Sequence, residues 1–364
     1  MRTATDQFCS GTILCGGTAG CSRKDSSGDQ GTWTLGLRFF FGGIGSVLRY
    51  GLKTGESSWR SRVRASATGP FGHADYPLLN TLDYPGDPGV CGPGSASWSV
   101  LSDVAAFVGG IRALLVQSAH PEVVAGVADH SRYRVDPLGR LSRTSSYVTA
   151  TTFGARKEAE AAVEAVRLAH QGLIGTSHRG RPYSADNPHL SAWVHNVLTD
   201  SFLSAHRAFG AAPLGQDQAD LFVAEQARIG QMMNADPIPR RAETLAGWVA
   251  DHPDLDFSPG MRDTVRFLAD PPLDRAQKAG YRMLYIGAVS TIPARIRAIL
   301  GIRGWPGGRR IGRGAVRFLR SVLGFSPSWE LALIRTGSPI PEGIFCQPLP
   351  VDLPPDWSPY RLDE

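Results

Sequence analysis

The chain has 364 residues, of which 42% are hydrophobic and 20% charged, and its formal net charge is +5. This length and composition suffice for one large hydrophobic core or two ordinary domains. No element before Arg303 gathers arginines with interleaved aromatic residues, so the charge disfavours a nucleic-acid-binding protein and indicates a mildly basic surface.

The cysteines disfavour a disulfide framework and a zinc module. Their number is odd and no Cys-x-x-Cys pair occurs, which favours a reducing compartment. The five positions are Cys9, Cys15, Cys21, Cys91 and Cys346.

Residues 1–80 are rich in Gly, Ser and Thr, and we expect a poorly ordered N-terminal segment with at most a short helix near 44–53. Thr18–Cys21 is similar to a lipoprotein cleavage site, but the apolar run before it is too short and glycine-rich for an export signal. No apolar stretch reaches the roughly 20 residues of a membrane-spanning helix. We therefore expect a cytoplasmic protein, with peripheral membrane contact left open.

Local signals predict a helical domain over residues 81–325. Pro121 opens a helix, and Asp136–Pro137 and Asn187–Pro188 each place an N-cap residue before a proline at the first helical position. Alternating strand patterns are nearly absent. The sequence therefore predicts an all-α fold.

Near the C-terminus, the most apolar predicted helix spans residues 273–300. Pro293 should end or kink its first part, and its apolar length favours a buried core helix over a membrane-surface helix. Residues 326–364 are proline-rich, and we expect them to form a tail over the surface.

Seven of the nine histidines lie between Asp103 and His206, and His170 is the first candidate ligand among them. On the predicted helix 155–174 it joins the apolar stripe that contains Val163 and Val166, so we expect it in the middle of the buried face. A core histidine of this kind either makes structural hydrogen bonds or ligates a metal or haem iron.

A second histidine pair lies on the helix that begins at Pro188. The helical period places His195, Thr199 and His206 in one narrow stripe. The two imidazoles lie about three turns apart, too far to chelate one ion. They could line one elongated pocket or make hydrogen bonds that support other site residues.

Arg140, Arg143 and Thr144 follow one another at i, i+3 and i+4, so they share a helix face. Two guanidinium groups and a hydroxyl can hold carboxylates or stabilise an oxygen species. The alternative is a pair of surface arginines at the exposed start of a helix.

Several short motifs resemble the MpaB-type oxygenase family, which shares its catalytic domain with the latex-clearing rubber oxygenases. In this sequence they occur in the family's order over about 85–300. They are Gly109–Gln117, His120–Pro121, Ala125–Ser131, Asp136–Leu141, Thr152–Gly154, His170 with Gly175, Tyr183–Ala185, Trp193–His195 and Ser201–Phe202.

The resemblance implies a globin-like helical core that binds haem b and activates dioxygen for an unsaturated or otherwise small apolar substrate. By motif order, His170 would be the axial iron ligand, with His195 as the second candidate for cofactor binding. Arg140, Arg143 and Thr144 correspond to an Arg-x-x-Lys-Thr group near the haem. Arg143 replaces its lysine, and an arginine cannot lose its proton to ligate iron.

Two other functional classes stay open at the level of sequence. One is a haem-binding protein without turnover, which would keep His170. The other is a non-haem metal hydrolase that would use a histidine set with an acidic ligand. Its residues would be His120, His130 and His195, with Asp129 or Glu225.

Overall fold

The computed structural model describes residues 59–69, 76–131 and 135–353. All of these residues belong to one contact unit, Lys53–Glu364. The short helix predicted near 44–53 therefore lies outside the described residues.

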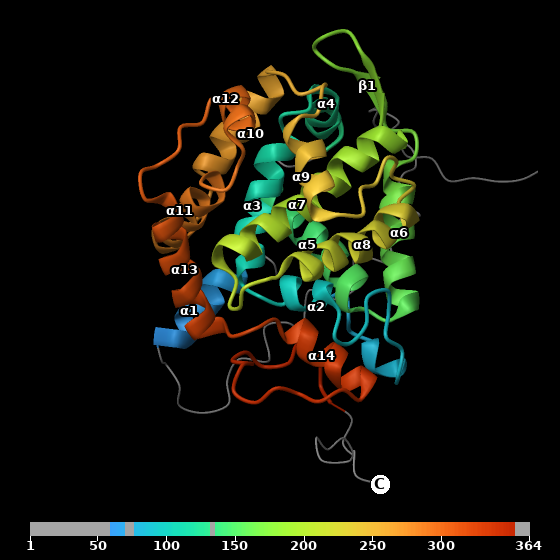
Figure 1. The fold of residues 1–364 in the computed structure, drawn as a ribbon, viewed down its shortest axis with the longest axis vertical. Coiled ribbons are helices and arrows are strands. Elements are labelled where there is room, and N and C mark those ends of the chain that lie inside the picture. Colours follow the sequence, from blue (N-terminus) through green and yellow to red (C-terminus); the bar gives the residue numbers. More distant parts are fainter. Residues whose placement is uncertain (1–58, 70–75, 132–134, 354–364) are drawn as a thin grey trace, which may run out of the picture. The chain divides into compact units, whose positions relative to one another are not determined.

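The described part of the chain contains fourteen α-helices and only two short strands, so the all-α prediction from the helical pattern is confirmed (Figure 1). Their bounds are Trp59–Thr68 (α1), Ala96–Leu101 (α2), Ala105–Gln117 (α3), Pro121–His130 (α4), Pro137–Phe153 (α5), Arg156–His170 (α6), Pro188–Phe209 (α7), Gln216–Met232 (α8), Ala242–Ala250 (α9), Pro259–Ala269 (α10), Arg275–Val289 (α11), Ala294–Leu300 (α12), Gly308–Leu323 (α13) and Pro327–Thr336 (α14). A 3₁₀ turn, η3, spans Thr81–Asp83. Among these helices, none has the length and apolar character to cross a membrane.

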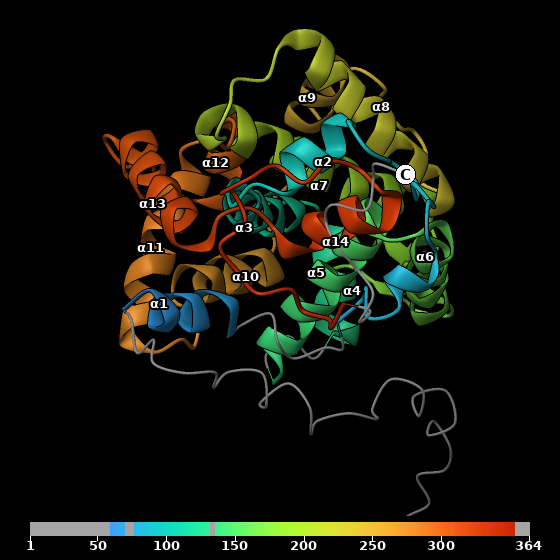
Figure 2. The ribbon, with the colours of Figure 1, turned by 90° about the horizontal axis from the view of Figure 1, so that it is seen from below.

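Helices α3 and α7 pack against each other in the middle of the described fold. Figures 1 and 2 show them between α11 and α13 on one side and α6 and α8 on the other. At Gly109 of α3 the backbone lies so close to α7 that an added Cβ atom would come within 2.6 Å of the Phe202 ring. The glycine therefore sets the distance between the two central helices.

The predicted helix starts are confirmed by their capping contacts. The Asp136 carboxylate accepts the Gly139 N–H at the start of α5, and the Asn187 side chain accepts the His189 N–H at the start of α7. Pro293 separates α11 from α12, as its missing N–H predicts.

One β-hairpin was not predicted. Strands β1 (Ile174–Thr176) and β2 (Pro182–Ser184) pair antiparallel with Gly175 opposite Tyr183. A Cβ atom at Gly175 would overlap the Tyr183 ring and hydroxyl, so this position admits glycine alone without rearrangement. Each strand has three residues, too few for an alternating pattern to be read from the sequence.

The C-terminal segment differs from the expected surface tail, because α14 packs into the fold. Leu331 is buried, and the buried Arg335 guanidinium donates to Thr81 and to the Phe153 carbonyl. Leu78 is likewise buried, although it lies in the segment predicted to be poorly ordered. These contacts could not be predicted from the proline-rich composition, because they depend on residues far away in the chain.

Candidate functional site

Helices α5 and α6 form a hairpin that places the predicted site residues at one end. Only Gly154 and Ala155 separate the two helices, which pack against each other. In a hairpin with so short a connection, the first turn of one helix lies at the same end as the last turn of the other. Arg140 and Arg143 therefore lie at the end where α6 finishes with His170.

His170 is half-buried and is the last residue of α6. The expectation that it lies in the middle of the buried face was wrong, because the described buried side chains of this helix are Ala159 and Val163, nearer its start. Burial lowers the pKa of His170, and the charge of Asp186 opposes this effect. Within the described residues its ring has no hydrogen-bond partner. It is thus a neutral imidazole with a free lone pair at neutral pH.

The Arg-x-x-Arg-Thr group occupies the first two turns of α5. Arg143 is exposed, and its Nη1 lies 3.4 Å from Oδ2 of Asp136, the N-cap residue. The Thr144 hydroxyl donates to the Arg140 carbonyl at 3.1 Å. A guanidinium carries five N–H donors, so the Asp136 contact leaves Arg143 donors for a carboxylate of a bound group.

Large apolar side chains are exposed at the same end of the hairpin. Val135 precedes α5 and is 77% exposed, Leu168 in the last turn of α6 is 55% exposed, and Ile174 in β1 is 67% exposed. The Ile174 carbonyl lies 3.2 Å from Nε2 of His130 at the end of α4. Scattered exposed apolar residues are ordinary, but these three leave apolar side chains uncovered just before α5, at the end of α6 and in β1.

His195 lies between α7 and α8. Burial lowers its pKa to about 4, against the opposing effect of a backbone hydrogen bond with Gln226. A Cβ atom added at Gly230 of α8 would come within 2.8 Å of the ring nitrogen Nε2. The Thr199 hydroxyl lies 3.5 Å from the same nitrogen. These contacts favour a role in helix packing over one in ligand binding.

His206, the other member of that stripe, lies at the end of α7 beside Gly210. Burial lowers its pKa, and the charge of Asp103 opposes this effect. Its Nδ1 has no hydrogen-bond partner within the described residues.

The structure does not bring the proposed hydrolase ligands together. His130 is exposed beside the Ile174 carbonyl, and Asp129 accepts a hydrogen bond from Tyr183 at 2.6 Å. Glu225 accepts the N–H groups of Ala96 and Ser97 at the start of α2.

His120 instead belongs to a group that the sequence analysis missed. Among the described residues, His120, His252 and Asp254 form the group of three side chains whose potential ligand atoms all lie within 4.8 Å of one another. His252 lies outside the histidine-rich interval. The sequence feature that could have revealed this group is the turn Asp251-His252-Pro253-Asp254, in which two potential ligands lie two residues apart.

The electrostatics around this group depend on Glu122. Burial alone would raise the pKa of Glu122, but hydrogen bonds from Arg179 and Ser177 outweigh it and lower the pKa to about 2. The Glu122 side chain is therefore a carboxylate at neutral pH. Its Oε2 lies 3.3 Å from Nδ1 of His120.

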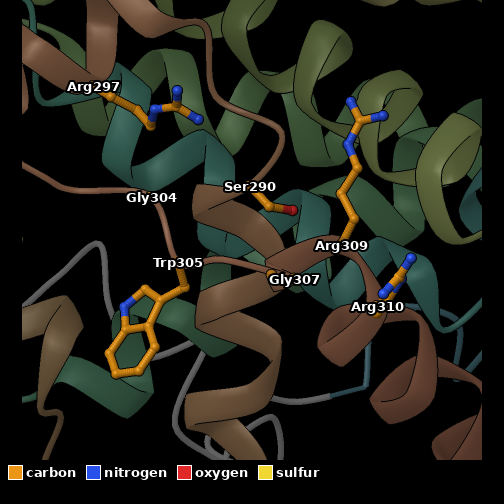
Figure 3. Close-up of a pocket in the computed structure, with 8 residues that line it drawn as sticks. Ser290, Arg297, Gly304, Trp305, Gly307, Arg309 and Arg310 are labelled. Atoms are coloured by element: carbon orange, nitrogen blue, oxygen red, sulfur yellow. The ribbon is translucent and has the colours of Figure 1, made fainter.

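Two cavities in the described part of the chain lie away from these residues. One, of about 350 Å³, is lined by Arg297, Trp305, Arg309 and Arg310 among others. Figure 3 shows its three guanidinium groups spread apart rather than pointing toward one centre. The other, of about 280 Å³, lies between α10 and α12 and includes Met261 and Leu300. Neither contains a predicted site residue.

The family model described as "ER-bound oxygenase mpaB/B'/Rubber oxygenase, catalytic domain" matches residues 98–321. The chain belongs to this family, as the motifs predicted. The match supports assignment to the oxidoreductases as an oxygenase catalytic domain. No curated protein and no solved structure gives a significant match.

Proposed function

We propose that the protein is a haem b-dependent oxygenase that uses dioxygen to oxidise or cleave an unsaturated or otherwise apolar substrate, and that His170 would hold the haem iron. One observation carries the proposal. A neutral imidazole without a hydrogen-bond partner among the described residues lies at the same end of the α5–α6 hairpin as Arg140 and Arg143.

The side chains at this end fit haem b by their chemistry. A neutral imidazole is a common axial ligand of haem iron, and arginine pairs well with carboxylates such as the propionates. Val135, Leu168 and Ile174 offer exposed apolar surface for a porphyrin face. When bound, haem b supplies an iron centre for dioxygen chemistry.

The residues of α5 would bind and orient the haem rather than ligate its iron. Arg143 keeps its proton, so it would donate hydrogen bonds to a propionate carboxylate. Arg140, one helical turn earlier, adds positive charge on the same face. Thr144, whose hydroxyl proton is directed to the Arg140 carbonyl, offers an oxygen that can accept a hydrogen bond from water.

An apolar substrate is consistent with the exposed apolar side chains beside His170. Such a substrate would cover Leu168 or Ile174 and exclude water from the reaction. His195, held between α7 and α8, would support the packing of these two helices rather than contact the iron.

Peripheral membrane contact remains a proposal. The exposed face of α13 carries Arg309, Arg313 and Arg317 together with Ile311 and Phe318. Basic residues interleaved with exposed apolar side chains are attracted to anionic lipid surfaces. This face could bring the enzyme to a membrane that holds an apolar substrate.

The test is the absorption spectrum of the purified, haem-supplemented protein beside its variants. We expect a Soret band in the wild type that shifts or disappears in His170→Ala. His178→Ala, which removes an exposed loop histidine, is the matched control and should leave the band unchanged. Absence of the band in the wild type would overturn the proposal, and an unchanged band in His170→Ala would overturn the ligand assignment.

Turnover distinguishes an oxygenase from a haem-binding protein without activity. The same preparation should consume dioxygen when supplied with alkenes of increasing chain length. A protein that shows the Soret band but no alkene-dependent oxygen uptake would support haem binding without this activity.

A further inference from the structure

We propose that His120, His252 and Asp254 form a binding site for a divalent late first-row transition-metal ion, for which Zn²⁺ is the first candidate. None of these three residues belongs to the α5–α6 hairpin that carries the proposed haem ligand and arginines.

The three side chains come from two segments that the fold holds together. His120 is the N-cap residue of α4, whereas His252 and Asp254 lie in the connection between α9 and α10. One potential ligand atom from each residue lies within 4.8 Å of the other two. The Asp256 N–H donates to the Ala119 carbonyl at 3.1 Å, which fixes the connection beside the start of α4.

The two histidines differ in how readily they can bind an ion. His120 is 4% exposed, and its Nδ1 makes no hydrogen bond within the described residues, with the Glu122 carboxylate 3.3 Å away outside hydrogen-bond geometry. An unpartnered buried polar atom costs free energy, which a ligand would recover. Nδ1 of His252 accepts the Asp254 N–H at 3.3 Å, so the neutral ring carries its proton on Nε2. A metal ion must therefore either replace this N–H at Nδ1 or bind Nε2 after the ring proton moves to Nδ1.

Two tryptophans hold the imidazoles in place. The Trp193 ring centroid lies 4.8 Å from that of His252 and 5.7 Å from that of His120. The Trp248 centroid lies 4.7 Å from that of His252. Rings packed in this way lose little further freedom when they coordinate an ion, which favours binding.

The donor set indicates the class of ion. Two imidazoles and one carboxylate suit zinc, copper, nickel or iron, whereas magnesium and calcium prefer oxygen ligands throughout. Three protein ligands would leave a zinc ion a fourth position for water. Glu122, whose carboxylate lies 3.3 Å from Nδ1 of His120, adds negative charge beside the site.

Two arginines compete with a metal ion for the Asp254 carboxylate. Removing one of them should therefore tighten metal binding, which can be tested. Arg181 Nη1 lies 2.8 Å from Oδ1 of Asp254, and Arg179 Nη2 lies 3.8 Å from the same oxygen. A metal ion must therefore displace or share the carboxylate with a guanidinium group. Removal of the exposed Arg181 should free Asp254 and tighten metal binding by roughly two- to fivefold.

The experiment measures ZnCl₂ binding by titration calorimetry on full-length protein whose cysteines have been alkylated. Alkylation is necessary because thiolates also bind zinc. We expect one Zn²⁺ per chain, binding weakened by at least about tenfold in both Asp254→Asn and His252→Gln, and no effect of MgCl₂. His178→Gln, an exposed histidine in the β-hairpin turn, is the matched control.

Tryptophan fluorescence provides a second readout that requires no activity. Cu²⁺ bound at this site should quench Trp193 and Trp248, and the quenching should be lost in Asp254→Asn, which keeps the side-chain shape. Failure of alkylated wild-type protein to bind Zn²⁺, or unchanged binding in both ligand variants, would overturn the proposal. Weaker binding in Arg181→Ala than in wild type would also contradict it.

Discussion

Arg112 of α3 and Asp200 of α7 form an ion pair of 2.7 Å in the core, with side chains 2% and 7% exposed. The same guanidinium donates to the Ser201 hydroxyl at 2.7 Å and to the Thr291 carbonyl at 3.5 Å. One buried arginine thereby links the two central helices to the turn after α11.

The first prediction concerns this ion pair. Arg112→Met should lower the free energy of unfolding by about 3–5 kcal/mol, because it leaves the Asp200 carboxylate buried without its partner. The double variant Arg112→Met/Asp200→Leu should recover much of that loss. Chemical denaturation measures both, and a double variant no more stable than the single one would contradict the explanation.

The second prediction concerns the close approach of α3 to α7. Gly109→Ala should destabilise the fold by about 1–3 kcal/mol, because the new methyl group would lie 2.6 Å from the Phe202 ring and force the helices apart. The measurement is the midpoint of chemical unfolding.

Gly110→Ala is the matched control for that variant. Nothing lies within 4 Å of a Cβ atom at Gly110, and alanine is favoured over glycine in a helix by about 0.8–1 kcal/mol. It should therefore stabilise the protein. Equal effects of the two substitutions would show that helix propensity, rather than the contact with Phe202, decides the result.

The third prediction concerns His195 and pH. Burial lowers its pKa to about 4, whereas an unfolded histidine titrates near 6.5. Between these values the unfolded chain binds a proton that the folded chain does not, so the stability from this group is lost as the pH falls from about 6.5 to 4. The expected loss is roughly 3 kcal/mol.

His195→Gln should remove this part of the pH dependence, which denaturation at a series of pH values between 7 and 4 would measure. His178→Gln, in an exposed turn, should retain the slope of the wild type. If the slope is the same in all three proteins, His195 is not neutral in the fold.

The fourth prediction separates the proposed cofactor role of Arg143 from a structural one. Arg143→Ala removes an exposed pair with Asp136, so the free energy of unfolding should change by less than about 1 kcal/mol. Haem affinity should nevertheless fall roughly tenfold through loss of a charge-assisted hydrogen bond. Arg167→Ala, which removes an exposed arginine of α6, is the control for a general loss of charge. Unchanged haem affinity in Arg143→Ala would show that Arg143 does not bind the haem.

The fifth prediction tests the basic face of α13. Wild-type protein should sediment with vesicles of phosphatidylserine and phosphatidylcholine, and Arg309→Glu/Arg317→Glu should reduce the bound fraction strongly. Vesicles of phosphatidylcholine alone serve as the uncharged control. Equal binding to both vesicle types would contradict an electrostatic attraction.

The starts of the helices could be predicted because their signals are local. Asp136, Asn187 and Pro293 act on N–H groups and backbone angles of their own neighbours, so no distant residue is required. The family was also evident from the sequence, since its motifs follow one another in chain order.

The positions of residues whose partners lie far away in the chain could not be predicted from local signals. His170 was expected in the buried face because its helical spacing fits, but only the packing of neighbouring elements shows that the core ends near Val163. Likewise, α14 is buried because its Arg335 reaches η3 and the end of α5, which composition does not reveal.

The sequence by itself thus determined the all-α class, the helix starts and the family, since hydrophobic period and capping depend on neighbouring residues. Tertiary structure alone decided which histidines meet. It separated His120 from His130 and His195 and placed it beside His252 and Asp254, because the packing of α4 against the connection between α9 and α10 joins segments far apart in the chain.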